Sequence, residues 1–239
     1  MTLSREAARA ITTPRMPAPV THYQGDAGRH YHEVKRGLPE EARPWLARLR
    51  AAKLQPCVQS SDVVLEYGVG AGWNLAQLAA ARRIGFDVAD FLRPELEAQG
   101  IEFVTDVATL PPALADVVIC HHALEHVLSP SQALADMRRL LRPGGRLLLW
   151  VPFEDERRHR RFERGEKNHH LYSWNVQTLG NLVEACGFRV VQAGLARYGW
   201  DRFAAAWAVR LGGGERGFLG FRALLQALRP LREVHVAAA

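Results

Sequence analysis

The sequence predicts an α/β fold in which helices cover both faces of a largely parallel sheet. Two observations lead to this prediction: short apolar runs rich in β-branched residues recur along the chain, and helix-like segments separate them. Strands that are apolar throughout suit a sheet buried on both sides, and the intervening helices supply the cover. The 239 residues are enough for one substantial core, so we expect one main domain.

The N-terminal part is predicted to be a tail and helical lid, residues 1–55. Residues 1–30 are rich in Pro, Gly and Thr and show no period, so we expect them to be irregular. Residues 31–55 have helical spacing, with Pro44 near a helix start. Five strands should follow, at 62–67, 83–88, 101–106, 116–120 and 146–151. Helices are predicted between them, among others at 73–83 and 129–142.

The last third of the chain departs from the regular alternation of strands and helices. It holds three further predicted elements: a helix at 176–188 that closes at Gly187, and strands at 188–196 and 231–239. Between these two strands, apolar residues at helical spacing lie on either side of Gly212 to Gly214. We therefore expect two short helices inserted at about residues 199–230.

Charge and cysteine content narrow the class of protein only partly. The formal net charge of +6 favours contact with anions, without choosing among a nucleic acid, a lipid headgroup and a small acidic metabolite. Residues 154–167 pair six basic with five acidic residues, which predicts a solvated face; an anion-binding lid is the alternative. Cys57, Cys120 and Cys186 form no CxxC pair, so neither a disulfide framework nor a zinc site is expected. No long apolar segment or leader is evident, which predicts a cytoplasmic protein.

The segment VLEYGVGAGW, residues 64–73, is the most informative motif. Its glycines Gly68, Gly70 and Gly72 follow a predicted strand, and bare backbone lets N–H groups approach a nucleotide-like ligand. Their spacing is GxGxG, whereas a dinucleotide-binding loop has GxGxxG. Glu66 precedes them, where a carboxylate would repel a pyrophosphate and attract a cationic amine. The motif therefore argues against a dinucleotide.

Two further acids end the next two predicted strands. Asp87 stands about twenty residues after the glycines, where a carboxylate accepts hydrogen bonds from ribose hydroxyls, and Asp90 is a rival for that role. Asp106 is followed by the apolar Val107, which together offer an acceptor and a surface for an adenine. A single acid at a strand end is often only a helix cap. Three in succession favour a nucleoside ligand.

The chain resembles the class I S-adenosylmethionine-dependent methyltransferases over residues 62–194. The resemblance is carried by the segments VLEYGVGAG, GFDVA, FVTDVATLP, ADVVICHHALEHV, LRPGGRLLLWVP and LVEACGFRVV. It implies a Rossmann-like, doubly wound, seven-stranded and mostly parallel sheet with an antiparallel last strand pair, in a cofactor-binding domain at residues 56–239. It also assigns parts of S-adenosylmethionine to residues: the amino group to Glu66, the ribose to Asp87, the adenine to Asp106 and Val107, and the methionine portion to the loop of Gly68, Gly70 and Gly72.

Histidines after the fourth predicted strand are the candidates for contact with the methyl acceptor. The segment CHHALEHV places His126 beside Glu125, and an imidazole oriented by a carboxylate is a suitable general base near neutral pH. The alternative is that His126 only packs at a helix start. His121 and His122 stand at the strand end, where we expect them to line the methionine and sulfonium side of the cofactor.

A second histidine cluster, within KNHHLYSWN at 167–175, follows the fifth predicted strand. His170 is the second predicted catalytic residue, and His169 and Tyr172 are predicted to bind the acceptor. Tyr172 has an alternative role as a staple of the following helix. No set of acids with ligand spacing accompanies the histidines, so no metal is predicted. Near the N-terminus, Tyr31 is predicted to fold over the cofactor as part of the lid.

These features predict methylation of a small molecule, at oxygen because the histidines can deprotonate a hydroxyl; methylation at nitrogen or carbon is the alternative. Nucleic acid is not expected, since no Asn/Asp-Pro-Pro-aromatic turn follows the fourth predicted strand. The insertion at 199–230 suits a lipophilic substrate, a membrane surface, a dimer contact or plain core cover, so monomer and homodimer both stay open. A non-catalytic cofactor-binding protein and a nicotinamide-dependent reductase are the remaining alternatives, and the reductase leaves Glu66 unexplained.

Overall fold

The structure, a computed structural model, describes residues 22–154, 161–164, 166 and 168–239. Within these residues seven strands form one sheet: β1 Val63–Tyr67, β2 Arg82–Phe86, β3 Glu102–Val104, β4 Ala115–His121, β5 Leu141–Pro152, β6 Val190–Tyr198 and β7 Leu231–Ala238. Their order is β3-β2-β1-β4-β5-β7-β6. β1 to β5 pair in parallel, and β7 runs antiparallel to both β5 and β6. The predicted seven-stranded, mostly parallel sheet is confirmed.

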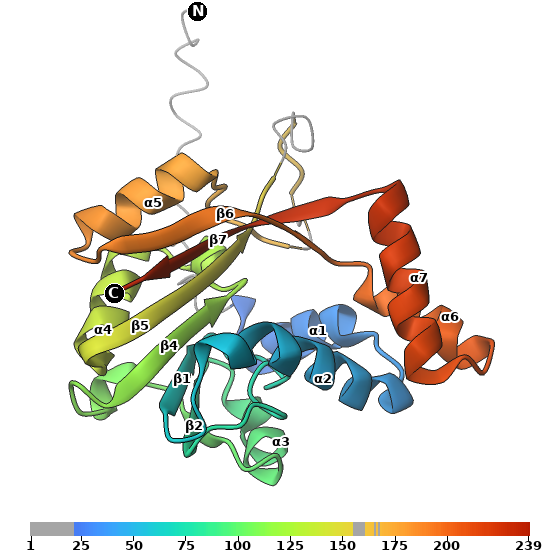
Figure 1. Cartoon of the computed structure of the whole chain (residues 1–239), viewed down its shortest axis with the longest axis horizontal. Helices are drawn as coiled ribbons and strands as arrows, with labels where there is room; N and C mark the ends of the chain where they lie inside the picture. The colour runs from blue at the N-terminus through green and yellow to red at the C-terminus, as the bar shows by residue number, and fades with distance from the viewer. Residues whose placement is uncertain (1–21, 155–160, 165, 167) are drawn as a thin grey trace, which may run out of the picture.

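Helices surround this sheet (Figure 1). The α-helices are α1 Gly25–Arg36, α2 Arg43–Leu54, α3 Arg93–Ala98, α4 Pro130–Leu140, α5 Val176–Ala185, α6 Asp201–Arg210 and α7 Gly214–Leu228. Short 3₁₀ helices lie at Glu40–Ala42, Gln55–Cys57, Asp90–Leu92, Val107–Thr109 and Leu124–His126.

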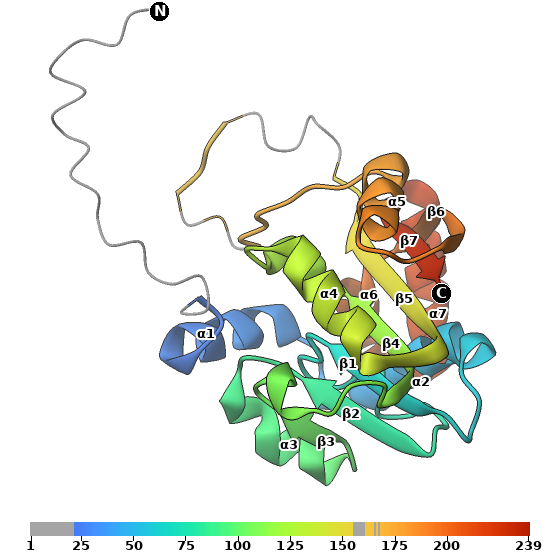
Figure 2. The same ribbon diagram turned by 90° about the vertical axis from the view of Figure 1, so that its left-hand side faces the viewer.

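Successive residues of the central strands face opposite layers, as the side-chain period of a strand requires. On β4, Val117 packs into a cluster that includes Leu96 of α3, whereas the next residue, Val118, packs into a cluster with Leu134 of α4 and Leu179 of α5. Figure 2 shows α4 lying along β4 and β5. The apolar strands predicted from the sequence are therefore buried on both faces.

The helical insertion between β6 and β7 contributes to a separate apolar cluster. α6 and α7 lie at the end of the molecule away from α5 (Figure 1). Ala204 and Phe218 from this pair are fully buried together with Leu46 of α2. The predicted insertion of two helices is confirmed, and its inner face packs on the N-terminal helices.

The helix predicted at 73–83 is wrong. Residues 73–77 form turns and β2 already begins at Arg82. The Arg83 guanidinium donates hydrogen bonds to the carbonyls of Leu75 and Ala76, at 3.1 and 2.8 Å. The backbone N–H of Ala79 donates instead to the side chain of Gln55, at 2.9 Å. The side chains of Arg83 and Gln55 therefore bond backbone groups that a continuing helix needs.

The irregular structure predicted for residues 1–30 is also wrong in part, because α1 begins at Gly25. Gly28 lowers the helical signal in the sequence. In the fold this glycine is buried, and a Cβ there would lie 2.1 Å from the Tyr23 carbonyl oxygen and 3.1 Å from the Phe91 ring. Its lack of a side chain thus serves close packing.

Part of the N-terminal tail, residues 1–21, and residues 155–160, 165 and 167 lie outside the described residues. The interpretation of 154–167 as a solvated face or an anion-binding lid thus stays a prediction. None of the described helices has both the length and the apolar character that crossing a membrane requires.

Candidate functional site

A cavity with a volume of about 590 Å³ lies at the carboxyl ends of β1, β2 and β4. β1 and β4 are neighbours in the sheet although two strands separate them in sequence, so this is the switch point at which open α/β sheets bind ligands. Its polar and aromatic lining includes Tyr23, Tyr31, His32, Arg50, Glu66, Asn74, Asp87, His121, His122, Glu125, His126, Glu154, Asn168, His170 and Tyr198.

The glycine loop forms one wall of the cavity. The N–H groups of Gly68 and Val69 donate to the Phe86 carbonyl, at 2.8 and 2.9 Å, and so turn the chain across the end of β2. Gly68 has φ +79°, and a Cβ there would lie 2.3 Å from the Ala123 Cβ. Gly68 and Gly70 line the cavity, whereas Gly72 does not and faces Leu96 of α3.

Glu66, at the end of β1, is a buried carboxylate in the cavity wall. Asn74 donates a hydrogen bond to its Oε1, and its Oε2 has no hydrogen-bond partner among the described residues. Burial raises the pKa of Glu66 to about 8; Asp87 adds to this rise, while Asn74 and Arg50 oppose it. A buried acceptor atom without a donor suits a cationic donor such as the amino group of S-adenosylmethionine. The cofactor that the sequence implies therefore fits this wall.

Asp87, just after β2, lies beside the same loop. Its Oδ2 accepts from the Gly70 N–H at 2.9 Å, and its Oδ1 accepts from the Ala89 N–H at 3.0 Å. Burial raises its pKa, and these two backbone donors act against the rise. Each carboxylate oxygen has a second lone pair for a further donor, so Asp87 retains the capacity to accept from a ribose hydroxyl.

The two residues predicted to bind the adenine, Asp106 and Val107, are outside the cavity lining. Asp106 is exposed and caps the 3₁₀ helix Val107–Thr109, where it accepts from the Ala108 N–H at 2.8 Å. Val107 is buried in the core. Neither residue lines the cavity, whose apolar walls near β2 are instead Phe86 and Val88.

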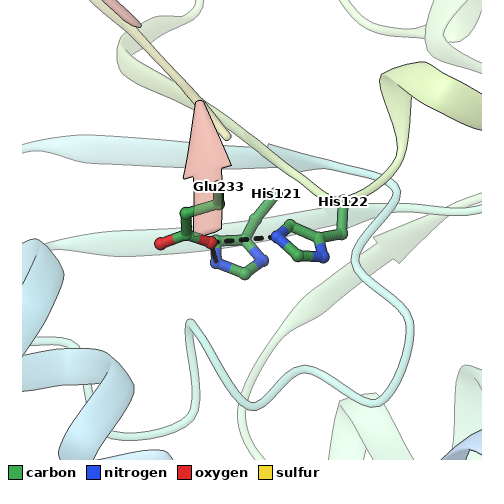
Figure 3. Close-up of side chains that lie close together, drawn as sticks. All are labelled: His121, His122 and Glu233. Carbon is green, nitrogen blue, oxygen red and sulfur yellow. Dashed lines mark hydrogen bonds and ion pairs between the residues drawn. The ribbon is translucent and has the colours of Figure 1, made fainter. Parts of the chain in front are cut away.

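His121, the last residue of β4, and His122, the residue after it, lie stacked beside Glu233 of β7 (Figure 3). His122 Nε2 lies 2.9 Å from Glu233 Oε2, and Lys53 Nζ of α2 donates to Glu233 Oε1 at 2.6 Å. His121 Nε2 accepts from Arg50 and Lys53, at 2.8 and 3.2 Å, which requires a neutral imidazole with the proton on Nδ1. Burial lowers the pKa of His121 well below its usual range, and the two cations add to the effect.

His126 and His170 meet in a second cluster on the cavity wall. Their ring centroids are 4.9 Å apart, although the two residues come from different segments of the chain. The hydroxyl oxygen of Tyr23 lies 2.8 Å from His126 Nδ1. His170 Nδ1 lies 2.9 Å from Glu154 Oε1. The structure thus brings together the two histidines that the sequence marks as catalytic candidates.

The three predicted acceptor-binding residues are placed differently from one another. Tyr31 lines the cavity and lies edge-on to Tyr23, with ring centroids 5.0 Å apart. His169 stacks on His22 at 4.3 Å, and the Tyr172 hydroxyl donates to the Leu128 carbonyl at 2.8 Å. His169 and Tyr172 are outside the cavity lining.

Sequence reasoning missed several residues of the cavity. Asn74 follows the glycine loop directly, so its distance from Glu66 of eight residues was a usable signal. Tyr23, Arg50 and Glu154 had no such signal, because only the packing of distant segments brings them to the cavity.

Comparisons with known proteins concern the family and the fold. Residues 34–193, more than half of the chain, match the family model described as a methyltransferase domain. A curated relative, an uncharacterized 37.1 kDa protein in transposon TN4556 of Streptomyces fradiae, is 39% identical over 105 residues, which are 38% of this chain and 30% of the relative. The chain therefore spans less than a third of the length of that relative.

Two solved structures share the fold. The 1,6-didemethyltoxoflavin-N1-methyltransferase of Burkholderia thailandensis, solved with 1,6-didemethyltoxoflavin and S-adenosylhomocysteine, is 21% identical with a TM-score of 0.60, covering 94% of this chain and 91% of its own. The [4+2]-cyclase SpnF is 20% identical with a TM-score of 0.55, covering 80% of each chain. From the family match and the confirmed sheet, we conclude that this chain belongs to the methyltransferase-domain family.

Proposed function

We propose that this protein transfers a methyl group from S-adenosylmethionine to a hydroxyl group of a small molecule. The observation that carries the proposal is a single cavity whose walls hold both the Glu66 and Asp87 pair and the His126 and His170 pair. Cavities of this size hold drug-sized ligands. The free thiols of all three cysteines suit a reducing compartment and support a location in the cytoplasm.

The cofactor half of the site is assigned to the residues around the glycine loop. Glu66 Oε2 accepts from the cofactor's amino group, and Asp87 accepts from its ribose hydroxyls. Phe86 and Val88 supply an apolar surface for the adenine, and the adenine contacts of Asp106 and Val107 stay predictions. When bound, S-adenosylmethionine supplies a methyl group already activated by its sulfonium, so the protein must mainly align an acceptor and exclude water.

The histidine cluster is assigned to the acceptor. A hydroxyl is a poor nucleophile until its proton is removed, and a neutral imidazole is the usual group for that task near pH 7. Tyr23 orients His126, and Glu154 orients His170. Tyr31 lies edge-on to both Tyr23 and His126, so it helps to hold the base in place. These contacts favour oxygen as the methylated atom.

Transfer of isotope-labelled methyl groups to a panel of phenols, sugars and amines tests the proposal. We expect label on at least one hydroxyl acceptor. His126→Gln should then lower kcat by at least about tenfold, because proton removal slows, while the Kd for S-adenosylmethionine changes less than about twofold. His30→Gln, an exposed histidine on α1, is the control and should leave both constants unchanged.

Other outcomes separate the alternatives. The Burkholderia neighbour is named as an N1-methyltransferase, so label found only on amines would move the assignment from oxygen to nitrogen. Tight binding of S-adenosylmethionine without label on any acceptor would favour a non-catalytic cofactor-binding protein.

A further inference from the structure

Three side chains with metal-ligating atoms converge in the histidine cluster. Glu125 and His126 belong to the 3₁₀ helix after β4, and His170 comes from the segment that leads to α5. One ligand atom from each residue lies within 4.8 Å of the other two. The Glu125 side chain is 1% exposed, so its carboxylate is held at a fixed place in the protein. All three residues line the cavity.

The distances within this cluster suit a shared ion better than direct bonds. His126 Nε2 lies 3.8 Å from Glu125 Oε1, too far for a hydrogen bond. Ligand atoms that share one transition-metal ion, with bonds of about 2.0–2.2 Å, are themselves roughly 3–4 Å apart. The pair is therefore spaced as two neighbouring ligands would be.

Each imidazole also has an orienting partner at its other ring nitrogen. Glu154 bonds His170 Nδ1 and the Tyr23 hydroxyl bonds His126 Nδ1, so an ion would be bound through the Nε2 atoms. Metal-bound histidines almost always make such a bond through the second nitrogen, because it fixes the tautomer and the ring orientation.

The neighbouring cluster of His121, His122 and Glu233 offers the same types of ligand and provides a comparison (Figure 3). There the Lys53 ammonium bonds both His121 and Glu233, and the Arg50 guanidinium bonds His121. Cationic groups already hold the positions around these ligand atoms, and they would repel a metal ion. A metal ion is therefore disfavoured at this neighbouring cluster.

We propose that Glu125, His126 and His170 bind one divalent transition-metal ion beside the methyl acceptor. Two imidazole nitrogens and one carboxylate oxygen suit Zn²⁺, Co²⁺, Mn²⁺ or Fe²⁺ better than Mg²⁺ or Ca²⁺. Three protein ligands leave coordination positions for an acceptor oxygen. The role of the ion rests on the proposed function: a hydroxyl bound to a divalent cation has a lowered pKa, so it loses its proton to solvent water. With the ion bound, His126 and His170 act as its ligands, and the ion takes over the activation of the hydroxyl from an imidazole base.

Metal binding is measured without the cofactor or an acceptor. The untagged full chain is treated with EDTA, desalted and titrated with CoCl₂ and ZnSO₄ by calorimetry, and the visible absorption of Co²⁺ reports ligation. We expect one ion per chain and much weaker binding of MgCl₂. His126→Gln and His170→Gln should each weaken Co²⁺ binding by at least about tenfold, and Glu154→Gln by about tenfold through loss of the orienting bond.

Matched controls locate the site. His122→Gln alters the neighbouring cluster, and His30→Gln alters an exposed histidine; both should bind Co²⁺ as the parent does. Thermal unfolding and the Kd for S-adenosylmethionine, measured on each variant, identify those that keep the native fold. For the parent alone, proton NMR of the Co²⁺ form should show two paramagnetically shifted imidazole N–H signals.

Absence of stoichiometric binding, or unchanged Co²⁺ binding in the doubly substituted His126→Gln/His170→Gln chain, overturns the proposal. So does loss of binding in His122→Gln alone. The proposed methyl transfer fails separately: a chain that binds Co²⁺ as expected but takes up no S-adenosylmethionine keeps its metal site and loses the proposed activity.

Discussion

At the scale of single residues, Glu66 is an ionisable side chain in an environment that disfavours its charged form. It is a carboxylate in a buried position, and burial raises its pKa to about 8. In the protein without a ligand, this position favours the protonated acid. When a cationic ligand binds beside Glu66, the carboxylate becomes the favoured form. Perturbed groups of this kind cluster at functional sites because binding or catalysis makes use of them.

This conflict predicts that cofactor binding releases a proton. At pH 7, below a pKa of about 8, Glu66 is mostly protonated. The cofactor's ammonium favours the carboxylate and expels that proton, so affinity should rise with pH up to about 8 and then level off. Calorimetry at pH 7 in buffers of different ionisation enthalpy measures the release.

Two controls test the assignment to Glu66. Glu66→Gln should release no proton and bind S-adenosylmethionine at least about tenfold more weakly, since it loses a charge-assisted hydrogen bond. 5′-Methylthioadenosine, which lacks the amino group, should bind the parent without proton release. Equal release by parent and Glu66→Gln would assign the proton to another group.

At the scale of elements, the turn after β1 is fixed by backbone conformation and by contact with the segment after β4. Gly68 and Gly144 share almost the same φ, +79° and +78°. A Cβ at Gly68 would meet the Ala123 Cβ at 2.3 Å, whereas a Cβ at Gly144, in β5, would meet nothing within 4 Å. Alanine substitutions at the two glycines therefore share the same backbone strain and differ in steric overlap.

Gly68→Ala should destabilise the protein more than Gly144→Ala. The left-handed conformation costs a residue with a Cβ about 1–2 kcal/mol at either site, and overlap adds a further cost only at Gly68. Urea unfolding at pH 7 gives both free energies. Equal losses would mean that the segment after β4 moves aside freely, and Gly68→Ala should also bind S-adenosylmethionine less tightly if the loop shifts.

At the scale of the whole molecule, Lys53 and Glu233 join α2 to β7 across 180 residues of sequence. Although burial acts to raise it, the pKa of Glu233 is lowered to about 2 by the hydrogen bond from His122 and by Lys53. Glu233 is buried, and its contacts with Lys53 and His122 link α2 to the sheet. A paired buried charge is costly to break because its partner is left behind.

Glu233→Gln should therefore destabilise the protein by about 3 kcal/mol at pH 7. Because the folded pKa lies below the unfolded value, the contribution of Glu233 is complete above the unfolded pKa and declines as pH falls toward 2. Urea unfolding at pH 7 and pH 3 should show the difference between parent and variant shrinking. Glu102→Gln removes an exposed pair with Arg82 and should cost below about 1 kcal/mol. A similar loss for both variants would contradict the proposed importance of burial.

The sequence by itself determined the order of strands and helices, the glycine loop and the acids Glu66 and Asp87 beside it. These features are local, because a period of two or 3.6 residues, or a fixed spacing, depends only on residues close together in the sequence. The same local signal failed at 73–83, where the side chains of Arg83 and Gln55 bond the backbone groups that a helix needs.

Only the tertiary structure decided which side chains share the cavity. Tyr23 reaches His126 from 103 residues away, and Glu233 reaches His122 from 111 residues away. No periodicity links such pairs, because their meeting depends on how the helices pack on the sheet and on the antiparallel entry of β7. The chain thus encodes its glycine loop locally, whereas the surroundings of its histidines arise from packing between elements far apart in sequence.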